Sequence, residues 1–83
     1  MKIKIDDNYS LSSDARNVML VENKVSQEGK EYETTVGYYG TVETALKGYL
    51  RLKINSSDAI TVPELMADIK RVEKTIEAVL KGY

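Results

Sequence analysis

The sequence predicts an α+β domain in which a three-stranded antiparallel meander is followed by two helices that pack on one sheet face. Up to about residue 40, apolar side chains alternate with polar ones in short stretches rich in β-branched residues, which is typical of half-buried strands. Beyond that point the apolar side chains recur every three or four positions, which indicates amphipathic helices. No linker or internal repeat separates the two halves, so the 83 residues are expected to form one domain, 1–83.

The first half of the chain contains the three predicted strands. The segment Asp6–Asn8 interrupts the first strand and favours a turn or a bulge, because such side chains hydrogen-bond their own backbone, but the alternation resumes at Tyr9. A polar loop separates the second strand from the third, and Gly29 within it can adopt the positive φ that hairpin loops use. The strands are expected at residues 2–12, 17–25 and 31–39.

The second half contains the two predicted helices. Thr41 is expected to be the N-cap of the first helix, because its hydroxyl can accept a hydrogen bond from a free backbone N–H. Gly48 inside this helix costs about 1 kcal/mol relative to alanine, and it marks either a close packing contact or an exposed weak point. Thr61 and Glu64 fit a capping box for the second helix, which is expected over about residues 62–80.

The second helix has the most regular pattern in the chain. Its apolar side chains are separated alternately by four and three residues, and the same spacing reaches Tyr83. We expect this stripe to pack mainly on the chain's own sheet. The alternative is the seam of a homodimer, because the two patterns differ little over three heptads. The stripe consists of Leu65, Ile69, Val72, Ile76 and Val79.

The composition argues against an enzyme. Cysteine and histidine are absent, which removes thiolate chemistry, the commonest general base and the commonest zinc ligand. Asp6 and Asp7 are adjacent, so on a strand their carboxylates would point to opposite faces and could not act as a pair. A serine activated by a lysine stays open chemically, but no motif supports it. We therefore expect no catalytic residues, no metal site and no cofactor.

The charge balance and the hydropathy limit the partners and the location. Twelve basic and 13 acidic side chains give a net charge of −1, whereas a nucleic-acid coat protein would be clearly basic. The first residues contain no apolar signal core, and no stretch approaches the roughly 18 apolar residues of a membrane span. We expect a soluble cytoplasmic protein with no membrane partner.

Four residues around the strand-to-helix junction are candidates for partner binding. Tyr38 and Tyr39 are neighbours on a predicted strand, so their side chains point to opposite faces and one ring should be presented to solvent or to a partner. Lys47 and Arg51 are four residues apart and share one helical face, where they could contact phosphate groups while a tyrosine stacks on a base. An edge tyrosine that covers a small core and an ordinary solvated helix face are the alternative interpretations.

The same junction supports a family resemblance. Residues 37–50 read Gly-Tyr-Tyr-Gly-Thr-Val-Glu-Thr-Ala-Leu-Lys-Gly-Tyr-Leu. This segment resembles the pattern G-Y-Y/F-x-T/S-x-E-x-A-L-K-G of small uncharacterised proteins encoded by bacteriophages of Gram-positive bacteria. The similarity extends to Ile5–Tyr9, Val18–Val21 and Gly29–Glu31, and therefore spans most of the chain. The family supplies no catalytic residues to carry over.

The resemblance implies a non-enzymatic phage accessory protein that acts by protein binding in the cytoplasm of the host cell. The expected partner is a host or defence protein, and the expected role is inhibition of a bacterial defence system, as in anti-CRISPR proteins. Two alternatives stay open. One is a nucleic-acid-binding accessory factor of phage DNA metabolism that uses Lys47, Arg51 and an exposed tyrosine. The other is a structural homo-oligomer, such as a homodimer, formed through the C-terminal helix.

Overall fold

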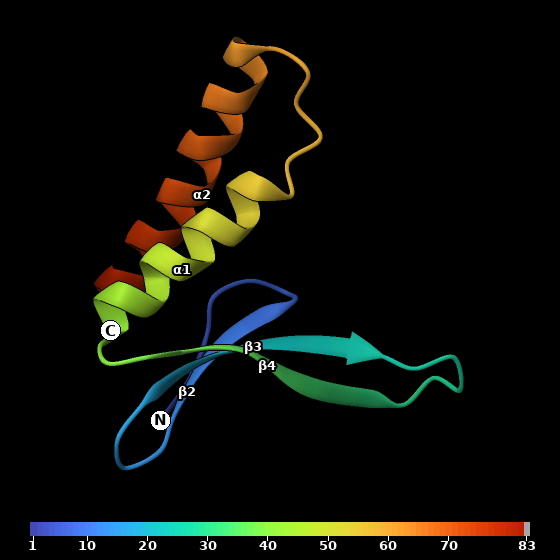
Figure 1. Cartoon of the computed structure of the whole chain (residues 1–83), viewed down its shortest axis with the longest axis vertical. Coiled ribbons are helices and arrows are strands. Elements are labelled where there is room, and N and C mark those ends of the chain that lie inside the picture. Colours follow the sequence, from blue (N-terminus) through green and yellow to red (C-terminus); the bar gives the residue numbers. More distant parts are fainter. Residues whose placement is uncertain (83) are drawn as a thin grey trace.

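The computed structural model describes residues 1–82, in which four antiparallel strands precede two helices (Figure 1). The strands follow one another across the sheet in the order β1-β2-β3-β4, so β1 and β4 form its two edges. Tyr83, which the sequence places on the apolar stripe, lies outside the described residues. The elements are β1 (Lys2–Lys4), β2 (Tyr9–Ser13), β3 (Val18–Val25), β4 (Glu31–Tyr39), α1 (Val42–Asn55) and α2 (Val62–Gly82).

The predicted three-stranded meander is wrong, because residues 2–12 form two strands instead of one. The chain reverses after Ile5, whose N–H donates to the Tyr9 carbonyl at 2.9 Å. Asp6 fixes the reversal, since its Oδ1 accepts from the N–H groups of both Asn8 and Tyr9 at 2.8 Å. Ile3 then pairs with Leu11 across the new hairpin. The alternation on each side of the turn has the same period, so from the sequence one long strand and a hairpin look alike.

The hairpin of β3 and β4 is the longest feature of the sheet, and its tip projects beyond the helices in Figure 1. Gly29 lies in its loop with φ 83°, as the sequence predicts. The register shifts within the hairpin, because Leu20 pairs with Gly37 and Val21 pairs with Thr35. Val36 is therefore the extra residue of a β-bulge, which is a device that bends a strand and redirects a side chain.

Both helices begin at the predicted N-caps. Thr41 and Thr44 form a reciprocal capping box in which each backbone N–H donates to the other residue's Oγ1 at 3.2 Å. At α2, Glu64 donates its N–H to Thr61 Oγ1 at 3.3 Å, but its carboxylate accepts from the N–H of Ile60 instead of completing a box with Thr61. The helix continues to Gly82, two residues beyond its predicted end.

The two helices form two successive layers above the sheet and do not lie side by side on it. α1 contacts β3 and β4, whereas α2 runs antiparallel to α1 and packs chiefly on α1 (Figure 1). The prediction that both helices cover one sheet face therefore holds for α1 alone. An apolar helical stripe has the same spacing whether it faces a sheet or a helix, so the pattern could not distinguish the two partners.

The core is continuous from the sheet through α1 to α2. Leu11 and Leu20 from the sheet and Ala45 of α1 are fully buried in one cluster. The stripe of α2 supplies the last part of this core: Val72 and Val79 are buried, and Leu65, Ile69 and Ile76 are half-buried. The stripe is therefore used for intramolecular packing, but its partner is α1, and the prediction that it packs mainly on the sheet is wrong.

Within residues 1–82, no helix combines the length and the apolar character needed to cross a membrane.

Candidate partner-binding site

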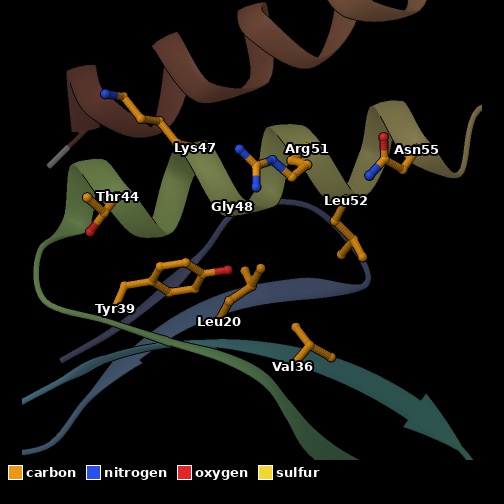
Figure 2. A pocket seen from close by; sticks show the side chains of 9 residues that line it. All are labelled: Leu20, Val36, Tyr39, Thr44, Lys47, Gly48, Arg51, Leu52 and Asn55. Atoms are coloured by element: carbon orange, nitrogen blue, oxygen red, sulfur yellow. The ribbon is translucent and has the colours of Figure 1, made fainter.

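A cleft lies between α1 and the edge of the sheet formed by β4 (Figure 2). Its volume is about 390 Å³, which is within the range of small-ligand and side-chain pockets. Apolar side chains from β3, β4 and α1 make up much of its lining, and polar groups of α1 complete it. The lining residues are Leu20, Val36, Tyr39, Thr44, Lys47, Gly48, Arg51, Leu52 and Asn55.

Tyr39 and two glycines set the width of this cleft. A Cβ atom at Gly37 would lie 2.7 Å from the Tyr39 ring, and a Cβ at Gly48 would overlap that ring. The missing side chains therefore let α1 approach β4 with the Tyr39 ring between them. Of the two interpretations left open for Gly48, the close packing contact is the correct one. Tyr39 is half-buried by this packing, so it acts as a wall of the cleft.

Tyr38 lies on the opposite face of β4, as the alternation of the strand predicts. It pairs with Met19 across the hairpin and is 65% exposed. The tyrosine presented to solvent is therefore Tyr38, and it does not line the cleft. The structure thus brings Tyr39, Lys47 and Arg51 together and separates Tyr38 from them.

The charged residues of the cleft are all cations. Figure 2 shows the Arg51 guanidinium beside Gly48, whereas the Lys47 side chain points away from Tyr39 towards α2. In residues 1–82, the ion pairs within 4.0 Å engage four other cations and neither of these two. No aspartate or glutamate belongs to the lining. The lining of the cleft therefore has a positive charge at Arg51, although the chain as a whole has a net charge of −1.

A buried tyrosine anchors α1 at the position that forms the cleft. The Tyr49 hydroxyl donates to Asp6 Oδ2 at 2.6 Å, and the ring meets Tyr9 edge-on at 5.7 Å. Burial, with the carboxylate of Asp6 as a second cause, raises the pKa of Tyr49. Lys53 lies 5.7 Å from the centre of the Tyr9 ring on the outside of this contact. Asp6 therefore joins the first hairpin to the helix, a role that its turn-forming sequence does not reveal.

Six of the nine cleft residues were not among the predicted partner-binding residues. The β-bulge at Val36 puts Gly37 and Tyr39 on the same face as Leu20, and Leu52 and Asn55 belong to the C-terminal part of α1. No sequence signal gives the position of a bulge or the crossing of a helix over a sheet. The aromatic and basic residues of the junction were the detectable part of this site. Within residues 1–82, no group of three or more acidic side chains is placed to hold a metal ion.

The fold is that of a small α+β domain with a cleft between α1 and β4. The chain is similar to a phage protein described as "Uncharacterized 10.4 kDa protein in GpA 5'region", from Escherichia phage 186. The two are 25% identical over 86 residues, which covers 99% of this chain and 94% of that protein. No family model and no solved structure matches the chain. The predicted resemblance to small phage proteins is thus supported at that level, and the Gram-positive host range and the junction motif stay predictions.

Proposed function

We propose that the chain is a phage accessory protein that acts by binding another protein, and that this partner is a host or defence protein whose activity it inhibits. The single observation that supports binding best is the cleft between α1 and β4, which combines an apolar lining with cations that have no ion-pair partner within residues 1–82. The likeness to a phage protein of nearly the same length supports the phage setting.

Exposed apolar side chains beside the cleft favour a protein as the partner. Val36 is 43% exposed at the mouth of the cleft, and Tyr38 is 65% exposed on the other face of the same strand. Tyrosine and arginine are enriched at the centres of protein interfaces. A partner that covers β4 would bury both groups, and their burial would add to the binding free energy.

Nucleic-acid binding is the second candidate, and the exposed Lys47 and Arg51 support it. Stacking is the difficulty, because base recognition on a single strand needs an accessible aromatic face. The Tyr39 ring packs against Gly37 and Gly48, and the exposed Tyr38 lies on the other face of β4. No accessible tyrosine ring therefore lies beside these two cations, and the protein partner is the better supported proposal.

Capture from a lysate of the bacterial host tests the proposal. The wild-type chain and two charge-reversal variants would be immobilised: Arg51→Glu in the cleft, and Lys70→Glu on the exposed side of α2 as the matched control. We expect the wild type and the control to retain a host protein with a Kd in the micromolar range or below, and Arg51→Glu to retain less of it. The absence of any retained protein would contradict the proposal. Retention of nucleic acid that falls steeply with salt would favour the second candidate.

A further inference from the structure

The outer edge of β4 has no strand beside it within residues 1–82. β4 is nine residues long, whereas β1 at the opposite edge has three residues. Long unpaired edges are usually blocked by charges or proline. β4 has Glu31 and Glu33 near the hairpin loop, but residues 34–39 beside α1 contain neither a charged residue nor proline. The part of the edge nearest the cleft is therefore open to pairing with another strand.

The ladder of the hairpin indicates which backbone groups of β4 point outward. Ser26 donates its N–H to the Lys30 carbonyl at 2.8 Å, so these two residues form a hydrogen-bonded pair next to the loop. Inward and outward groups alternate along an antiparallel strand. The alternation directs the N–H and C=O groups of Glu33 and Thr35 away from β3. These N–H groups can donate hydrogen bonds to an added strand, and these C=O groups can accept hydrogen bonds from it.

The cleft lies beside this edge and can receive side chains from such a strand. An added strand would direct every second side chain towards α1. The space there is about 390 Å³, bordered by Val36, Leu52 and Tyr39. Recognition of extended peptides commonly combines an open sheet edge with pockets for alternate side chains. Apolar side chains of the partner fit the lining at these positions.

The charge of the cleft selects the chemistry of the partner segment. Arg51 lies on the α1 side, and no carboxylate of the lining neutralises it, whereas Lys47 points towards α2 (Figure 2). Resting on the protein-binding function above, we propose that β4 accepts an extended segment of the partner protein as a fifth strand. Every second side chain of that segment faces α1. These side chains are apolar and enter the cleft, except for at least one aspartate or glutamate among them, which meets Arg51. A second copy of this chain is a poorer occupant, because residues 34–39 of its own edge offer no carboxylate.

A display library of random dodecapeptides, selected on the immobilised full chain, is the probe for this mode of binding. We expect enriched peptides in which every second position is apolar and at least one position of this same set is aspartate or glutamate. Fluorescence anisotropy should show that Arg51→Glu weakens these peptides by about tenfold or more, the effect expected of one lost charge-assisted hydrogen bond. Lys70→Glu should leave their affinity within about twofold. Thr35→Pro should abolish binding, because proline removes an outward N–H while edge positions tolerate its ring.

Backbone amides provide a second readout that does not depend on Thr35→Pro folding. In ¹⁵N spectra of the wild type, a selected peptide should shift the amides of Glu33 and Thr35 and slow their hydrogen exchange. Failure to enrich any peptide, a basic consensus, equal binding to Arg51→Glu, or shifts confined to α2 would each overturn the inference. Protection of these two amides in the free chain, with a dimeric mass by light scattering, would show self-pairing and overturn it as well. If lysate capture survives in both Arg51→Glu and a folded Thr35→Pro, the protein-binding function stands and only this mode fails.

Discussion

Replacing Gly48 with alanine tests whether the approach of α1 to β4 is as close as the structure indicates. In an ordinary helix interior, alanine is about 1 kcal/mol more favourable than glycine. Here the new Cβ would overlap the Tyr39 ring, which is itself backed by Gly37. Overpacking typically costs about 1–3 kcal/mol, and because this overlap is deep we expect a cost of about 3 kcal/mol. After subtraction of the propensity gain, Gly48→Ala should lower the free energy of unfolding by about 2 kcal/mol.

A double-mutant cycle separates the two contributions. In a Tyr39→Ala background the ring is gone, so the same Gly48→Ala change should become stabilising by about 1 kcal/mol through helix propensity. Urea unfolding followed by circular dichroism would measure all four free energies. For a domain of 83 residues, each kcal/mol corresponds to a shift of about 4–8 °C in Tm. Stabilisation by Gly48→Ala in the wild-type background would refute the close packing of Tyr39 between the two glycines.

Three further predictions concern the anchors of the fold. Asp6→Ala should lower the free energy of unfolding by about 2–4 kcal/mol, since it removes two turn hydrogen bonds and the acceptor of the buried Tyr49 hydroxyl; a urea-unfolding loss below about 0.5 kcal/mol would speak against it. Because the pKa of Tyr49 is raised, above about pH 10 the unfolded chain releases a proton that the folded chain keeps, and the free energy of unfolding should fall as pH rises. Unfolding measured between about pH 8 and 11 should show a weaker fall in Tyr49→Phe than in the wild type. Equal slopes in the two proteins would count against this assignment. Val72→Ala should cost about 2 kcal/mol and the exposed Met66→Ala less than about 0.5 kcal/mol, and the reverse order in thermal melts would contradict the packing of α2 on α1.

Sequence periodicity was sufficient for the helices and insufficient for the first hairpin. The N-caps Thr41 and Thr61 were predictable because capping depends on residues close in sequence. The reversal at Asp6 also depends on local bonds, but the choice between a turn and a bulge is reinforced by Tyr49, which is 43 residues away. A contact at that separation leaves no periodic trace in the sequence, so the first two strands were predicted as one.

The sequence predicted some of the residues of the candidate site, but it did not predict the cleft in which they lie. Alternation correctly put Tyr38 and Tyr39 on opposite faces, and helical spacing correctly put Lys47 and Arg51 on one face. The cleft itself depends on the strand order, which leaves β4 at an edge, and on the bulge at Val36. Both features follow from tertiary packing. The stripe of α2 was likewise recognised as a packing surface, while its partner α1 emerged only from the structure.

Hydrogen exchange of the chain alone and in complex with the captured host protein tests the central proposal most directly. If the partner binds at the cleft and along β4, peptides covering residues 31–39 and the part of α1 around Arg51 should exchange more slowly in the complex. The hairpin of β1 and β2, at the opposite edge of the sheet from β4, should exchange as it does in the free chain. Protection confined to that hairpin or to the exposed side of α2, with residues 31–39 unchanged, would contradict the proposal.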